Sequence, residues 1–125
     1  MSRRGRTGQD QRGSGTVLMA AIMSVVVALG VVATIVAGYL VSHHQARSAA
    51  DLAALSGAAA FARGGDACSQ AGRTARANGA RATRCDQVGD EVDFVVTVRV
   101  VVEVRIRSPG LPRRVEAEAH AGRVG

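Results

Sequence analysis

The chain opens on a short polar stretch and then becomes apolar without interruption. No residue from Gly13 to Ser42 is charged, and Thr16–Val41, 26 residues, is almost purely apolar. A helix rises about 1.5 Å per residue and a bilayer core takes about 20 residues, so this segment is long enough to span a membrane. It is also longer than the apolar region of a secretory signal peptide. A small domain could not wrap a helix that is apolar on all faces, so the pattern predicts a retained membrane helix.

The helical pattern continues beyond the apolar segment. Residues 43–63 contain no Pro and are rich in Ala, which predicts that the helix leaves the membrane as an exported helix. Leu52, Leu55 and Ala59 define an apolar stripe on this helix. Gly64-Gly65 supplies the signal that ends this helix.

The last half of the chain changes from a helical to an alternating pattern. Asp66 is placed to cap a short helix over residues 67–80, and residues 93–107 then alternate between β-branched and polar side chains. A Pro- and Gly-containing break at 108–112 precedes a second alternating run over 115–121, with Arg and Glu placed to pair across the strands. This order predicts an α+β fold with a C-terminal antiparallel hairpin or small sheet laid on the exported helix. Because a two-stranded ribbon is marginal alone, we expect a third short strand or an oligomeric partner.

Charges on either side of the apolar segment predict its orientation. Four arginines precede the segment and only Asp10 opposes them, whereas the charges just after it nearly cancel. The positive-inside rule then places the N-terminus in the cytoplasm. The predicted organisation is a cytoplasmic basic leader over 1–13, a transmembrane helix over 14–42 and an extracytoplasmic domain over 43–125.

Two stretches on either side of the membrane segment resemble a known family. The first is QRGSGTVL at residues 11–18, and the second is QARSAADLAALSGA at residues 45–58. In this order, separated by one membrane helix, they resemble the pilin-like TadE/TadG family of tight-adherence (Flp-type) pili and related secretion systems. The later pair Cys68 and Cys85, with the Asn78-Gly79-Ala80 turn and the Ala-rich terminal run, resembles a subgroup from high-GC Gram-positive bacteria.

The resemblance implies a minor pilin or pseudopilin that a prepilin peptidase processes. Such peptidases cut after a Gly that precedes the apolar helix, which maps here onto Gly13 with Ser14 as the new N-terminus. Pilins of this type usually carry Glu at the fifth mature position, where this chain has Leu18. A carboxylate in the bilayer is costly and is kept for a function, so its absence implies that the subunit does not enter a filament in the usual register.

The apolar helix also carries small residues at four-residue spacing. Gly30, Thr34, Gly38 and Ser42 form one row, and Ala20, Ser24 and Ala28 form another. Such rows let helix backbones approach closely in lipid, so the row Gly30, Thr34 and Gly38 is a candidate packing surface for other membrane helices. A composition rich in Ala and Gly also produces such rows by chance, and the sequence leaves both interpretations open.

Cys68 and Cys85 both fall in the predicted exported domain. Outside the cytoplasm two Cys in a small domain usually form a disulfide, and closing a loop of this size stabilises a fold by about 3 kcal/mol. Zinc is the competing interpretation, but two Cys without a nearby His fall short of the usual four ligands. Two free thiols are the remaining alternative. We therefore predict a disulfide and neither a metal nor a cofactor.

Composition narrows the classes of function that remain. The formal net charge is +6, all 16 basic residues are Arg, and only three residues are aromatic. No group of residues assembles an active site: three histidines are scattered, and the acidic run around Asp90 is expected to be a solvated turn. We expect no enzyme and no small-molecule substrate, with the membrane and other pilin-like or Tad assembly proteins as partners.

Two alternatives to a pilin remain open. One is a membrane-anchored accessory or scaffold protein of a secretion complex. The other is a pilin-like DNA-uptake binder, for which an arginine cluster would contact phosphates. No aromatic residue is interleaved in that cluster to stack on bases, which favours a solvated helix face instead. The cluster consists of Arg73, Arg76, Arg81 and Arg84.

Overall fold

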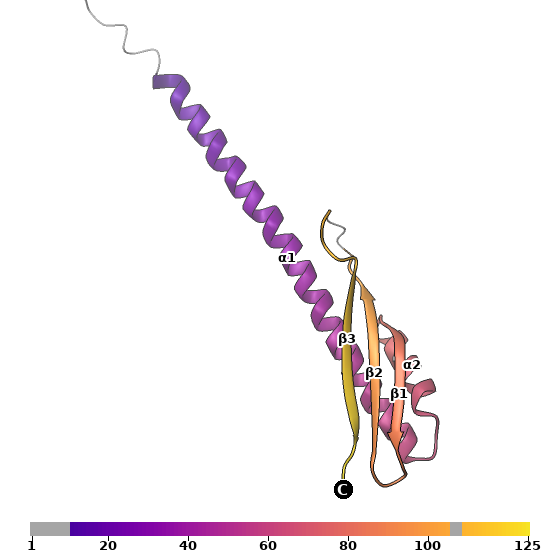
Figure 1. The fold of residues 1–125 in the computed structure, drawn as a ribbon. Coiled ribbons are helices and arrows are strands. Elements are labelled where there is room, and N and C mark those ends of the chain that lie inside the picture. The colour runs from indigo at the N-terminus through magenta and orange to yellow at the C-terminus, as the bar shows by residue number, and fades with distance from the viewer. Residues whose placement is uncertain (1–10, 106–108) are drawn as a thin grey trace, which may run out of the picture. The chain divides into compact units, whose positions relative to one another are not determined.

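The computed structural model describes residues 11–105 and 109–125. Its contacts divide the chain into two compact units, with the boundary in the sequence between Val36 and Ala37. Within these described residues, two helices and three strands follow one another (Figure 1). This is the α+β layout that the sequence pattern predicted, with a long apolar helix, a short helix and an antiparallel sheet. The basic leader predicted over 1–13 lies largely outside the described residues.

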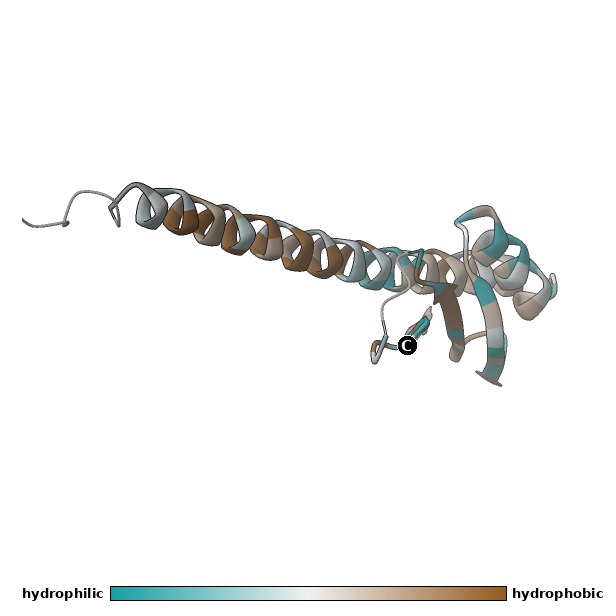
Figure 2. Cartoon of the chain, turned by 90° about the horizontal axis from the view of Figure 1, so that it is seen from above, coloured by the Kyte–Doolittle hydropathy of each residue, from teal (hydrophilic) through white to brown (hydrophobic). Residues whose placement is uncertain are grey.

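Helix α1, Gln11–Ala62, is 52 residues long and has no break. Over its N-terminal part the large apolar side chains are exposed on every side, and Val17 and Leu18 are 70% and 62% exposed. Figure 2 shows this hydrophobic stretch giving way to mixed polarity further along the helix. It is the one helix among the described residues that is long and apolar enough to cross a membrane. Exposed apolar residues on all faces of a helix indicate a single-pass membrane anchor.

Local hydrogen bonds end α1 and begin helix α2, Ala67–Ala77. The N–H groups of Gly64 and Gly65 donate to carbonyls in the last turn of α1, and Gly64 has a φ of +80°, which suits glycine. The Asp66 carboxylate then accepts from the backbone N–H of Ser69 at 2.8 Å, which is the predicted N-cap. Helix α2 ends at Ala77, close to the expected end at about residue 80, and Asn78 and Gly79 form its C-terminal cap.

A three-stranded antiparallel sheet follows, with strand order β1-β2-β3. Its strands are β1 Arg81–Gly89, β2 Phe94–Glu103 and β3 Arg114–Arg123. Strands β2 and β3 are the predicted hairpin, and β1 is a third strand, which was one of the two expectations and was not located in the sequence. The alternation predicted as far as Arg107 ends earlier as a strand, at Glu103, and residues 106–108 lie outside the described residues. In the pair β2–β3 the Arg99 guanidinium lies 2.7 Å from the Glu118 carboxylate, as predicted for Arg and Glu across the strands.

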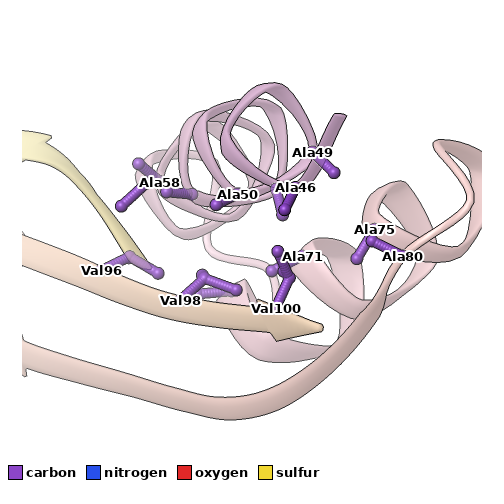
Figure 3. Close-up of a cluster of buried hydrophobic side chains, with 14 of the residues drawn as sticks. Ala46, Ala49, Ala50, Ala58, Ala71, Ala75, Ala80, Val96, Val98 and Val100 are labelled. Carbon is purple, nitrogen blue, oxygen red and sulfur yellow. The ribbon is translucent and has the colours of Figure 1, made fainter. Parts of the chain in front are cut away.

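The core of the second unit joins the C-terminal part of α1 to the sheet. Alternate valines of β2, Val96, Val98 and Val100, are fully buried beneath the helix (Figure 3). The buried side chains that the helix contributes to this core are alanines: Ala46, Ala49, Ala50, Ala53, Ala54 and Ala58. At the end of the helix Phe61 and Phe94 pack edge to face, with ring centroids 4.8 Å apart. Small side chains therefore bring the helix close to the sheet.

Candidate functional site

The predicted processing position lies near the start of α1. Gly13 and Ser14 are exposed and already helical, and the Thr16 hydroxyl donates to the Gly13 carbonyl at 3.0 Å. No atom lies within 4 Å of the point where a Cβ on Gly13 would sit, so packing does not require glycine there. Leu18, at the fifth position after Gly13, is an exposed apolar side chain.

Hydroxyl groups in the small-residue rows are satisfied within the helix. Thr34 donates to the carbonyl of Gly30, and Ser42 donates to that of Gly38 at 3.0 Å. Each hydroxyl donates to the backbone carbonyl four residues before it, so it is not free to bond a neighbouring helix. The row would therefore pack against another helix through van der Waals contact. Gly30 and Thr34 are exposed, and nothing lies within 4 Å of a Cβ added to Gly30. Gly38 is half-buried, and Ser42 is buried within the second unit.

The apolar stripe of Leu52, Leu55 and Ala59 faces largely outward. Leu52 is 43% exposed and Leu55 is 62% exposed, and only Ala59 is half-buried. The core side of the helix is the alanine face, because residues without long side chains allow the backbone to approach the sheet. The C-terminal part of α1 therefore exposes two leucines on its surface.

Close packing against this face depends on Gly57, a residue that the sequence interpretation did not single out. A Cβ at this position would lie 2.9 Å from the Ala67 carbonyl oxygen and 3.3 Å from a methyl carbon of Val96. At the neighbouring position the hydroxyls of Ser56 and Thr74 lie 2.7 Å apart and hydrogen-bond α1 to α2. Gly57 thus lets α1, α2 and β2 meet at one point.

The two cysteines form the predicted disulfide. Cys68 on α2 is bonded to Cys85 on β1, with their Cα atoms 5.7 Å apart. Cys85 pairs with Val98 in the sheet, so the bond ties the short helix to the edge strand beside the core. Among the described residues no group of three or more potential metal-ligating side chains comes together.

The arginine cluster does not form the single helix face that the sequence indicated. Arg73 and Arg76 lie on α2, whereas Arg81 and Arg84 lie on β1, so the cluster spans two elements. Arg84 donates to Asp86 at 2.7 Å, and this bond raises the pKa of its guanidinium above the ordinary value. An arginine whose charge is balanced by a neighbouring carboxylate is less available to a phosphate backbone.

The acidic run forms a tight turn between β1 and β2, as expected. The Asp90 carboxylate accepts hydrogen bonds from the backbone N–H groups of Asp93 and Val92, both at 2.9 Å. These bonds favour the charged form and lower the pKa of Asp90. The carboxylate is therefore used to shape the turn.

The three histidines lie on two elements. His43 and His44 are neighbours exposed on α1, whereas His120 lies on β3, where its Nδ1 is 2.8 Å from the Thr97 hydroxyl and its Nε2 is 3.5 Å from Glu118.

Comparison with protein families supports the resemblance found in the sequence. Residues 13–60 match a family model described as putative Flp pilus-assembly TadE/G-like, which covers the apolar part of α1 and most of the remainder of this helix. No curated protein and no solved structure matches the chain. The matched family is one of pilus assembly, a structural rather than a catalytic role. Over residues 13–60, and thus over nearly all of helix α1, the chain is similar to the TadE/G-like Flp pilus-assembly family.

Proposed function

We propose that the protein is a minor pilin or pseudopilin of a Tad/Flp-type pilus assembly or secretion system. Residues 14–42 span the membrane with the N-terminus in the cytoplasm, and residues 43–125 form the domain outside. The observation that supports this most is the dual character of α1, which is apolar and exposed at first and then supplies the alanine face of an α+β domain. The family match covers this same helix.

The first experiment measures the intact mass of the protein from its native host, with and without reduction before alkylation. A processed subunit begins at Ser14, and its two cysteines take up the alkylating agent only after reduction. A full-length chain with both thiols alkylated directly would contradict processing and export together. The variant Gly13→Leu serves as the control, because it removes the cleavage position from an exposed site where nothing packs.

Membrane assembly is proposed to use the row of Gly30, Thr34 and Gly38. Replacing Gly30 with Leu fills the row and should reduce recovery of partner subunits after crosslinking in membranes. Val32→Leu is the matched control, because successive helical residues are about 100° apart and Val32 lies on nearly the opposite side. Equal recovery of partners with both variants would show that this row does not pack against other helices.

Outside the membrane, the proposed partner surface is the exposed side of α1 around Leu52 and Leu55. Aliphatic side chains that are exposed on the same side of a helix can anchor a partner helix. On this proposal other pilin-like subunits cover the two leucines in the assembly. Crosslinks from residues beside Leu55 to those subunits are the expected result.

A membrane-anchored scaffold of the secretion complex is the second candidate. It is favoured by Leu18, which stands where a filament subunit usually carries Glu. Shearing pili from cells separates the two roles, because a minor pilin is found with the sheared filaments and a scaffold stays with the membrane. The protein in sheared filaments would exclude a permanent scaffold.

A further inference from the structure

One end of the sheet lies beside the point where the apolar segment of α1 ends. A cavity of about 410 Å³ is lined on one side by Gly38 and Val41 and on the other by Glu103 and Arg105. The opposite end of β2 meets the end of α1, where Phe94 packs on Phe61. Strand β2 thus runs back along the helix, and its last residues lie at the level where the uncharged sequence stops.

Basic side chains gather at this end of the sheet. Arg81 and Arg105 line a neighbouring cavity of about 570 Å³, and Arg113 and Arg114 line a third cavity with Glu103. We call Arg81, Arg105, Arg113 and Arg114 the basic end. These four positive charges face one carboxylate, Glu103, among the residues that line the three cavities. The turn at the other end of the sheet has the opposite character, with Asp90, Glu91 and Asp93.

An apolar side chain accompanies these arginines. Leu111 lies in the connection between β2 and β3, next to Pro112, and is 44% exposed. The cavity wall formed by Gly38 and Val41 is also apolar, whereas Ser42 and Gln45 add polar groups just beyond it. Arginines beside exposed aliphatic residues match a membrane interface, where charges meet headgroups and aliphatic groups meet the acyl boundary.

We propose that the basic end docks on the anionic phospholipid headgroups of the leaflet that the domain faces. The proposal rests on the proposed function only in that residues 14–42 span the bilayer. Arg105, Arg113 and Arg114 bind headgroup phosphates, and Leu111 enters the boundary between headgroups and acyl chains. The acidic turn is held away from the surface, so that the domain has one defined end toward the lipid.

The experiment uses the full chain, which contains no Trp, so that one added Trp is the only such fluorophore. Leu111→Trp places it in the docking connection, and Val92→Trp places it in the acidic turn as the matched control. Each variant is reconstituted into phosphatidylcholine vesicles with or without phosphatidylglycerol, and with acyl-chain-brominated phosphatidylcholine as the quencher. The expected result is blue-shifted, quenched emission for the Leu111→Trp variant in anionic vesicles and unquenched emission for the Val92→Trp variant.

Charge variants test whether the arginines are responsible. In the Leu111→Trp background, Arg105→Gln, Arg113→Gln and Arg114→Gln are expected to lower the ratio of docked to undocked chains by about fivefold each. Lysine at the same positions should retain most of the quenching. The control removes three arginines elsewhere, Arg63→Gln, Arg73→Gln and Arg76→Gln, and should change the ratio little. Formation of the Cys68–Cys85 disulfide, measured by alkylation, reports that each variant is folded.

Two results would overturn the inference. One is emission from the Leu111→Trp variant that is as unquenched in every lipid as that from the Val92→Trp variant. The other is quenching that is equal with and without phosphatidylglycerol and unaffected by the glutamine variants. Vesicle flotation distinguishes this failure from that of the proposed anchor. A chain that floats but does not dock refutes only the headgroup proposal, whereas a chain that does not float refutes both.

Discussion

At Gly57 the absence of a side chain decides how closely three elements approach. Gly57→Ala would force a methyl group against the Ala67 carbonyl and Val96, so we expect a loss of about 1–3 kcal/mol in the free energy of unfolding. Gly72→Ala is the matched control, because nothing lies near its added Cβ and alanine favours the helix by up to about 1 kcal/mol. Chemical unfolding in detergent micelles measures both. A Gly57→Ala protein as stable as the Gly72→Ala protein would contradict the packing described.

The disulfide is the second residue-scale determinant of stability. Cys68 and Cys85 are separated by 17 residues, and closing such a loop is worth about 3 kcal/mol in the chain-entropy model. The double variant with Ser at both positions should lose about that amount relative to the oxidised protein. Unfolding curves with and without reductant provide the measurement, and reductant should leave the double variant unchanged. A reduced wild-type chain that keeps its full stability would show that the bond is dispensable.

Asp90 gives the fold a predictable response to acid. Its pKa lies below the ordinary 3.8 because backbone N–H groups of Asp93 and Val92 stabilise the carboxylate in the folded state. A depressed folded-state pKa contributes stability above the unfolded-state pKa, and this contribution is lost as the pH falls through the folded-state value. Asp90→Asn keeps an acceptor oxygen but does not titrate, so its stability should fall less between neutral pH and about pH 3. Identical acid dependence in both proteins would argue against this role.

At the scale of elements, the two sides of the C-terminal part of α1 should respond oppositely to substitution. Leu55→Ser, on the exposed side, is expected to change stability by less than about 0.5 kcal/mol. Ala53→Leu, on the alanine face, would overpack the contact with the sheet and cost about 1–3 kcal/mol. Unfolding measurements on the two variants test the assignment of the faces. A larger loss from Leu55→Ser than from Ala53→Leu would reverse it.

Most elements could be predicted from the sequence because their signals are local. The uncharged run, the Asp66 cap and the alternation in β2 each follow from neighbouring residues. Strand β1 could not be located, since its sequence RATRCDQVG has no regular alternation and only Ala82 and Cys85 turn partly inward. The core face of α1 could not be located for a different reason. Leucine is the more hydrophobic residue, but the sheet approaches too closely for leucine, and only the three-dimensional packing reveals this.

Only those features of the candidate site that have a local signal could be predicted from the sequence. The pairing of Cys68 with Cys85 follows from the compartment and from the number of cysteines. The arginines of the basic end are scattered between residues 81 and 114, so that no sequence window brings them together. Antiparallel pairing of β1, β2 and β3 places them at one end. The end of the transmembrane segment predicted at Ser42 is a boundary of the bilayer. The start of the second compact unit at Ala37 is a boundary of packing within the protein, so it does not test that prediction.

At the scale of the whole molecule, the second unit should fold without the first. A fragment of residues 37–125, made in an oxidising compartment, is expected to form the disulfide and show the circular dichroism of a mixed α and β protein. A fragment of 43–125 lacks Tyr39, which packs on the core, and Ser42, which is buried, so we expect it to be less stable by about 1–3 kcal/mol. Thermal unfolding of the two fragments makes the comparison. Equal stability would show that the residues before His43 contribute nothing to the domain.

The disulfide between α2 and β1 affects how the domain would be translocated across the membrane. A translocation channel passes an unfolded chain, and on the proposed topology both cysteines cross it before they meet an oxidant. Until then the domain relies on a core of alanines, valines and two phenylalanine rings, so its folded state is weak while the thiols are reduced. Oxidation on the far side then closes the loop and stabilises the fold. The disulfide would thus favour export in one direction. The reduced chain can pass through the channel unfolded, whereas the oxidised and folded domain resists passing back.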